Sequence, residues 1–213
     1  MVPAAEGRTF TTRNPADARE EVAEYALGGA PDTVAAISAA RTAFPKWAAM
    51  TPIARGRILS KASQLLEARK TTLAELLVRE EGKTLAEATG EVQRAIDIFR
   101  FHGGLSYTLG GQTIPHELPG NLLYTRREPL GVVALITPWN FPIAIPAWKL
   151  APALACGNTV VIKPASAAPA MTLELAQALH EAGLPPGVIN VITGDGRSFG
   201  AEVAQNPAVQ ALS

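Results

Sequence analysis

The chain has 213 residues, enough for one large domain or two small ones with a hydrophobic core. Its 19 basic and 19 acidic residues cancel to a formal net charge of +0, which argues against a nucleic-acid or anionic-lipid partner. With 47% hydrophobic and only 18% charged residues, the composition excludes an intrinsically disordered chain and indicates apolar surface left for a partner.

The single cysteine and the amino-terminal segment predict a cytoplasmic protein. Cys156 cannot form an intramolecular disulfide or a thiolate-rich metal site, so we expect a reducing compartment and no metal. The first twenty residues carry acidic side chains and no continuous apolar stretch, unlike a secretory or transit signal. Residues 129–148 are uncharged over the length of a membrane helix, but Pro138, Pro142 and Pro146 favour a strand and a turn there.

Capping signals predict helices in the first third of the chain. The pair Pro31-Asp32 begins one apolar pattern at helical spacing, and the pair Thr51-Pro52 begins a longer one that covers two helices. Gly82 ends this run. A capping box of Thr84 and Glu87 then opens another helix, which we expect to end near residues 110–111.

After a loop at residues 112–121, apolar strands alternate with helices. Because nearly continuous apolar strands separated by helices indicate a parallel sheet covered on both faces, the fold class is α/β, with amino-terminal helices followed by part of a Rossmann-like sheet. We divide the chain into a helical region with its loop, 1–121, and an α/β region, 122–213. The expected strands are 122–127, 131–137, 159–162 and 188–192, and the expected helices are 142–155, 171–182 and 198–205.

Three loops follow strands of this sheet, and ligands bind at the carboxyl ends of parallel strands. The loops are residues 138–142, 163–166 and 194–200, and we expect them to face one crevice. The third has the spacing G-x-G-x-x-x-G, one residue longer than a dinucleotide fingerprint. It is therefore either a ligand loop or a tight turn that uses glycine for its backbone freedom.

The polar residues of these loops each allow two interpretations. Lys163 with Ser166 would hydrogen-bond a ribose, or Lys163 is a solvated charge. Asn140 would donate its amide to a developing oxyanion, or it belongs to a turn. Trp139 is an aromatic wall for a cofactor ring or a core residue, and Lys149 is a second charge near the site or a surface lysine.

Long stretches of the chain resemble the aldehyde dehydrogenase superfamily. The resemblance rests on GVVALITPWNFPIAIPAWKLAPALACGNTVVIKPAS and on AGLPPGVINVITGDGRSFG, and it extends to NPAD, EEGKTLAEATGEV and YTRREPLGVV nearer the amino end. NPADAREEVAEYALG and RAIDIFRFHGG look most like the bacterial 2,5-dioxopentanoate (2-oxoglutarate semialdehyde) dehydrogenases.

The resemblance implies oxidation of an aldehyde to an acid with NAD or NADP, in an enzyme that forms homo-oligomers. In that chemistry a cysteine thiolate attacks the carbonyl, hydride passes to the nicotinamide, and a glutamate activates the hydrolytic water. It implies that Asn140 is the oxyanion donor, that Lys149 supports the site, and that Lys163 binds the adenosine ribose. It further implies cofactor contacts from Ile136, Thr137, Pro138 and Trp139, with Gly196 and Gly200 packed against the adenine end rather than cradling phosphate.

The chain departs from the family pattern at one position of the cofactor site. Many NAD-preferring members carry glutamate where this chain has Ser166. A carboxylate there accepts from the 2′-hydroxyl and repels a 2′-phosphate, so its loss predicts that NADP is accepted.

The second departure is that the sequence given stops at Ser213, before the family's glutamate base and nucleophilic cysteine. We therefore expect an amino-terminal part of such an enzyme, inactive alone and without a catalytic domain. Cys156 is not a substitute nucleophile in this interpretation but a small buried residue at a helix-to-strand junction. Two alternatives remain: a noncatalytic cofactor-binding or interaction module, and part of a CoA-acylating relative.

Overall fold

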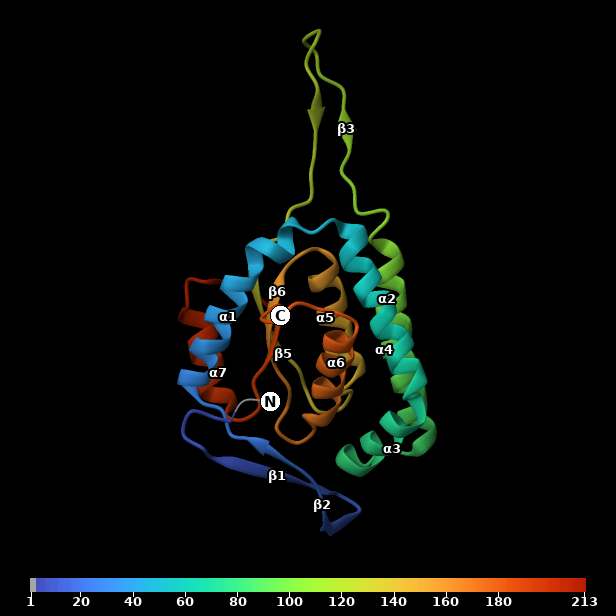
Figure 1. Cartoon of the computed structure of the whole chain (residues 1–213), viewed down its shortest axis with the longest axis vertical. Helices are drawn as coiled ribbons and strands as arrows, with labels where there is room; N and C mark the ends of the chain where they lie inside the picture. The colour runs from blue at the N-terminus through green and yellow to red at the C-terminus, as the bar shows by residue number, and fades with distance from the viewer. Residues whose placement is uncertain (1–2) are drawn as a thin grey trace.

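The computed structural model describes residues 3–213, which form a parallel sheet between two layers of helices (Figure 1). The sheet has four strands in the order β7-β6-β5-β8, and all neighbours are parallel. Residues Val132 to Ile136 pair in register with Thr159 to Lys163. The strands are β5 (Val132–Ile136), β6 (Thr159–Lys163), β7 (Ile189–Val191) and β8 (Val209–Leu212).

Alternate residues of the central strands face opposite helical layers, which is why these strands are apolar throughout. Val132, Ala134 and Val161 pack against α1 (Ala30–Ala49) and α7 (Gly196–Gln205). Val133 and Ile162 belong to the larger core on the other face. That core is covered by α2 (Pro52–Ala68), α4 (Leu85–Leu105), α5 (Ala144–Ala155) and α6 (Ala170–Glu181), with α3 (Lys70–Glu81) at its edge.

The predicted helix signals are confirmed except at α1, which begins at Ala30 with Gly29 as its N-cap, so that Pro31 and Asp32 lie inside its first turn. The Thr51 hydroxyl accepts from the Ala54 amide at 3.2 Å and caps α2, and Gly82 ends α3 in the left-handed conformation, with φ of 89°. Thr84 and Glu87 form the expected capping box of α4. This helix ends at Leu105, five residues before the expected position.

The sequence analysis missed two strand regions, the amino-terminal hairpin and the edge strand β8. The first third of the chain also contains a hairpin of β1 (Thr9–Asn14) and β2 (Asp17–Ala26), which the sequence analysis missed. Only Thr12 and Tyr25 of these strands are buried, so the hairpin carries no alternating apolar signal. The edge strand β8 was missed for a similar reason, since it has four half-buried or exposed residues.

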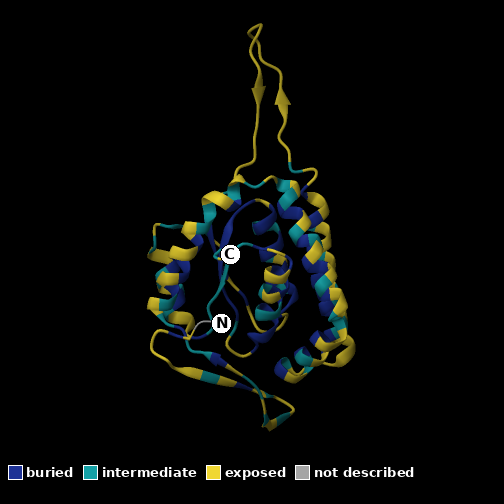
Figure 2. Cartoon of the chain, in the orientation of Figure 1, coloured by how far each residue is buried: buried dark blue, intermediate teal, exposed yellow. Residues whose placement is uncertain are grey.

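The expected strand at 122–127 is reduced to β4 (Leu123–Tyr124), which pairs with β3 (Thr113–Ile114) in a stretch expected to be loop. The two strands lie within a long arm that projects from the body, and residues 110–128 are all exposed (Figure 2). Without a layer to cover it, the arm forms only two pairs of ladder residues.

The uncharged stretch 129–148 forms β5, a loop and the first turns of α5, as its prolines predict. Among the residues that the structure describes, no helix combines the length and the apolar character needed to cross a membrane.

A buried carboxylate joins the amino-terminal hairpin to the helices. Glu80, 3% exposed at the end of α3, accepts from the Thr12 hydroxyl at 3.0 Å, the Tyr25 hydroxyl at 2.6 Å and the Ala170 amide at 2.8 Å. Burial raises the pKa of Glu80, and burial with the Glu80 contact raises the pKa of Tyr25. One side chain therefore fixes β1, β2, α3 and the start of α6 relative to each other.

Replacing Glu80 with alanine removes the acceptor of three buried donors, so we expect the free energy of unfolding to fall by about 3 kcal/mol. Chemical denaturation of the chain measures this loss. Glu75→Ala, on an exposed position of the same helix, is the matched control and should change stability by less than about 0.5 kcal/mol. Similar losses in both variants would contradict the structural role of Glu80.

Candidate functional site

The loops after β5, β6 and β7 meet at the carboxyl edge of the sheet, as the parallel topology requires. The Thr137 amide donates to the Lys163 carbonyl oxygen at 3.2 Å. The Ser166 hydroxyl donates to the Gly194 carbonyl oxygen at 2.9 Å. A Cβ atom at Gly196 would lie 3.5 Å from Lys163 Cε. The structure therefore brings together Thr137, at the end of β5, and four residues of the second and third predicted loops.

Lys163 ends β6 with its side chain buried at this edge. The residue is 5% exposed, and its ammonium donates to the Pro164 carbonyl oxygen at 2.9 Å. Burial lowers the pKa of Lys163, an effect that the charge of Asp195 partly opposes. Because an ammonium has three donors, Lys163 keeps hydrogen-bonding capacity for a ligand. The alternative of a solvated surface lysine is wrong.

A second polar group at the same edge is the hydroxyl of Thr137. Thr137 is buried immediately after β5, and its hydroxyl oxygen has no hydrogen-bond partner among residues 3–213. Buried polar groups are normally paired, so the Thr137 hydroxyl is available to bond a polar group of a ligand.

The glycine-rich loop serves the turn into α7. Gly194 has φ of 125°, and a Cβ atom there would lie 2.6 Å from the Gly28 amide nitrogen. The Asp195 carboxylate accepts from the Arg197 amide at 3.1 Å and the Ser198 amide at 2.9 Å, and these bonds lower the pKa of Asp195. An anionic side chain therefore caps α7 and occupies two of the amides at its amino end.

The face of α7 beyond this turn is open. Gly196 and Gly200 lie one helical turn apart, and nothing lies within 4 Å of a Cβ atom placed at Gly200. A planar ligand group, such as an aromatic ring, has room to approach α7 at Gly200.

The loop after β5 exposes its aromatic and amide side chains. Trp139 is 58% exposed, so the alternative of a core tryptophan is wrong. Asn140 is exposed too, and no hydrogen bond within residues 3–213 uses its side-chain amide. Its carbonyl oxygen accepts from the Lys83 ammonium at 3.1 Å. The loop thus presents an unpaired side-chain amide at Asn140, while Lys83 holds the backbone of the same residue.

Lys149 and Ile136 lie at the end of the sheet where β5 and β8 finish. The Lys149 ammonium donates to the Ser213 hydroxyl at 3.1 Å, and the Ile136 amide donates to the Ser213 carbonyl oxygen at 2.9 Å. Ile136 and Pro138 are both exposed beside this contact. Lys149 is therefore a half-buried charge at the carboxyl edge.

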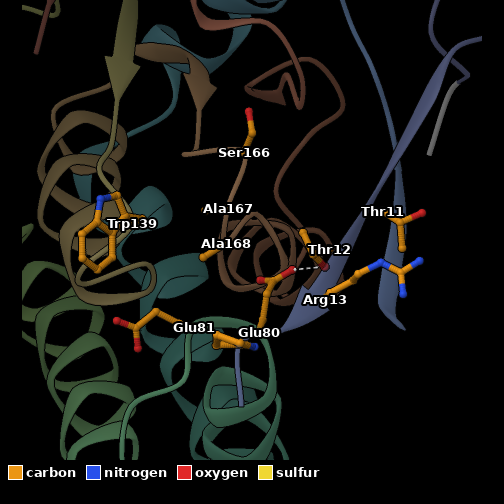
Figure 3. A pocket seen from close by; sticks show the side chains of 10 residues that line it. Thr11, Thr12, Arg13, Glu80, Glu81, Trp139, Ser166, Ala167 and Ala168 are labelled. Carbon is orange, nitrogen blue, oxygen red and sulfur yellow. Dashed lines mark hydrogen bonds between the residues drawn. The ribbon is translucent and has the colours of Figure 1, made fainter. Parts of the chain in front are cut away.

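A cavity of about 330 Å³ adjoins two of the predicted residues, Trp139 and Ser166 (Figure 3). Its opposite wall comes from the amino-terminal hairpin and the end of α3, which the sequence analysis did not place near the site. The additional lining residues are Thr11, Thr12, Arg13, Pro15, Glu80, Glu81, Ala167 and Ala168. No local pattern identifies them, because the hairpin signal itself is weak.

Cys156 does not match the expected buried residue. It caps the carboxyl end of α5, as the predicted helix-to-strand junction requires, but it is exposed. Because α5 runs from the end of β5 back to the start of β6, Cys156 lies at the opposite edge of the sheet from Asn140. Within the described residues, no group of three or more His, Cys, Asp or Glu side chains could hold a metal ion.

Comparison with known proteins gives one consistent family. The model of the aldehyde dehydrogenase family matches residues 1–213. The chain is 53% identical to an alpha-ketoglutarate semialdehyde dehydrogenase of Haloferax volcanii over 207 residues, which are 97% of this chain and 43% of that protein. It is 43% identical to a 2,5-dioxopentanoate dehydrogenase of Saccharolobus solfataricus, with the same two coverages.

Solved structures agree with this result. An NADP-dependent enzyme of E. coli superimposes with a TM-score of 0.96 at 39% identity, covering 99% of this chain and 44% of that one. PnpE in complex with nicotinamide adenine dinucleotide superimposes with a TM-score of 0.95 at 38% identity, covering 100% and 43%. The chain thus spans less than half the length of the relatives that it matches.

The buried charge of Lys163 should cost stability when no ligand is bound. Lys163→Met removes it, and we expect the free energy of unfolding to rise by roughly 1 kcal/mol near neutral pH. Since the folded pKa of Lys163 is lowered, the destabilising contribution of its charge decreases as pH rises to about 10.5, and the difference between the proteins that comes from this charge should vanish there.

Denaturation between pH 7 and 10.5 measures both effects. Lys46→Met, at an exposed position of α1, is the control and should leave stability nearly unchanged at every pH. A Lys163→Met protein that is less stable than wild type at pH 7 would show that the contacts of the ammonium offset the cost of burying its charge.

Proposed function

The chain belongs to the aldehyde dehydrogenase family, and we propose that it forms the cofactor-binding and oxyanion side of an enzyme that oxidises a semialdehyde, such as 2,5-dioxopentanoate, to an acid. The observation that carries the proposal is the meeting of three loops at the carboxyl edge of the sheet, with buried Lys163 and exposed Asn140 on two of them. The names of the two semialdehyde-oxidising relatives support the substrate class.

The residues present fit a nicotinamide dinucleotide. The Lys163 ammonium has unused donors and the Thr137 hydroxyl is unpaired, so both are suited to the hydroxyls of a ribose. The open face of α7 at Gly196 and Gly200 leaves room for the adenine end. Exposed Ile136, Pro138 and Trp139 would line the path between the two ends. When bound, the nicotinamide supplies the hydride acceptor.

Asn140 would act on the aldehyde oxygen. When a nucleophile attacks the carbonyl, negative charge develops on that oxygen, and a fixed amide donor stabilises it. The Asn140 amide is free for this task and its backbone is held by Lys83. Lys149, at the same edge, would add positive potential.

We assign the nucleophile and the general base to residues outside this chain. Cys156 is unsuited as the nucleophile because it lies at the far edge of the sheet. The chain alone should therefore bind cofactor without oxidising aldehyde. Its two parts, residues 1–121 and 122–213, would serve as the helical support and as the first part of the cofactor domain.

The position of Ser166 favours acceptance of NADP. Its hydroxyl bonds to the Gly194 carbonyl oxygen, and the neighbouring Asp195 carboxylate is occupied as the cap of α7. No carboxylate in the loop 163–166 is thus available to bind a 2′-hydroxyl or repel a 2′-phosphate.

Asn140→Ala tests the catalytic assignment in the full-length enzyme that contains this chain. We expect kcat for 2,5-dioxopentanoate to fall about 100-fold to 1000-fold, because one oxyanion donor is lost, while the Kd of the cofactor is unchanged. Asn121→Ala, on the exposed arm, is the matched control. An active enzyme whose kcat survives Asn140→Ala would remove Asn140 from the reaction, and a wild-type enzyme that oxidises no semialdehyde would refute the function.

Ser166→Glu tests the cofactor assignment. We expect the unmutated protein to bind NADP at least as tightly as NAD, and the variant to lose about tenfold or more in NADP affinity with little change for NAD. Calorimetric titration of both dinucleotides gives the two Kd values. Thr71→Glu adds the same charge at an exposed position of α3 and should change neither. Preference for NAD in the unmutated protein would contradict the assignment.

A further inference from the structure

A buried ion pair lies directly behind the loop that carries Asn140. The Glu91 side chain on α4 is 2% exposed and pairs with the Lys83 ammonium, whose side chain is 11% exposed. The other Glu91 oxygen accepts from the Ile143 amide at 3.0 Å and the Ala144 amide at 3.1 Å. Glu91 thus binds the first backbone donors of α5, which immediately follow the loop.

Lys83 extends this contact to the loop itself. Its ammonium donates to the Asn140 carbonyl oxygen at 3.1 Å and stands 4.7 Å from the centroid of the Phe141 ring. It also lies 3.6 Å from Glu81 Oε2, which is buried and has no hydrogen-bond partner among the described residues. Lys83 therefore joins two carboxylates on the amino-terminal helices to two successive residues of the loop.

The start of α5 has no cap of its own. Its N-cap residue is Ile143, which offers no side-chain acceptor, and the acceptor comes instead from Glu91, more than fifty residues away in the sequence. A side-chain cap at position 143 would accept from an amide further into the helix, whereas Glu91 binds the amides of Ile143 itself and of Ala144. A cap supplied from α4 does more, because it ties the position of the loop to a separate helix.

We propose that Lys83 and Glu91 are positioning residues that hold Asn140 in place for the reaction. Lys83 fixes the Asn140 carbonyl from one side, and Glu91 fixes the amides that begin three residues later. Because a misplacement of about 1 Å can cost roughly 100-fold in rate, the pair controls kcat without touching the substrate. This inference rests on the proposed role of Asn140.

Lys83→Met in the full-length enzyme provides the main test. We expect kcat to fall about 10-fold to 100-fold, with the Kd of the cofactor within about twofold of wild type. Lys83→Arg, which keeps the charge and the donors, should recover most of the rate. Lys70→Met is the matched control, because Lys70 bonds to Gln93 on the same pair of helices and makes no contact with the loop.

A second variant separates positioning from folding. Lys83→Met leaves the buried Glu91 carboxylate unpaired, which alone could unfold the protein. The double variant Lys83→Met with Glu91→Gln removes both charges and keeps an oxygen acceptor for the Ile143 and Ala144 amides. We expect this variant to melt near the wild-type temperature and still to show the low kcat.

Hydrogen exchange of the 213-residue chain gives a readout that does not depend on activity. Amides of residues 139–144 should exchange faster in both Lys83 variants that carry methionine, and at the wild-type rate in Lys70→Met. If wild type oxidises aldehyde and the double variant keeps its kcat, the inference is overturned. If wild type oxidises no aldehyde, the proposed function fails, and unchanged exchange of these amides would overturn the positioning of the loop as well.

Discussion

Two buried glutamates hold the amino-terminal helices and hairpin against the sheet. Glu80 binds donors from β1, β2 and α6, and Glu91 binds the first amides of α5 together with Lys83. Taking a carboxylate out of water is costly, and the cost is offset only when nearly every oxygen lone pair has a donor. Each glutamate therefore requires its partners in one geometry, which fixes the position of the loops at the carboxyl edge.

The candidate site lies where this support meets the sheet. Parallel strands bring three loops to one edge, and the helical layer then holds one of those loops through Lys83. The site keeps groups that folding alone does not favour: an ammonium in an apolar setting at Lys163, an unpaired hydroxyl at Thr137 and exposed rings at Trp139 and Phe141. These are the groups at the carboxyl edge that the proposed cofactor and aldehyde would contact.

Much of the fold was predictable because its signals are local. Thr51-Pro52, Gly82 and the Thr84 capping box lie within a few residues of the helix ends that they determine, and the apolar runs at β5 and β6 reflect burial on both faces. The hairpin of β1 and β2 escaped prediction since it buries only Thr12 and Tyr25. The short strand β8 pairs with β5 through backbone hydrogen bonds, and such bonds require no particular side chains.

By itself the sequence determined the helices, the apolar strands β5, β6 and β7, the three loops, and the residue types available on them for binding a dinucleotide and an oxyanion. Tertiary structure decided which groups are buried and which are exposed: it buried Lys163 and exposed Cys156. It alone placed Glu80 and Glu91, because the donors of Glu80 and the backbone donors of Glu91 lie more than fifty residues away along the chain. A local sequence pattern contains no information about partners at that separation, because they come within hydrogen-bond range only when the chain folds.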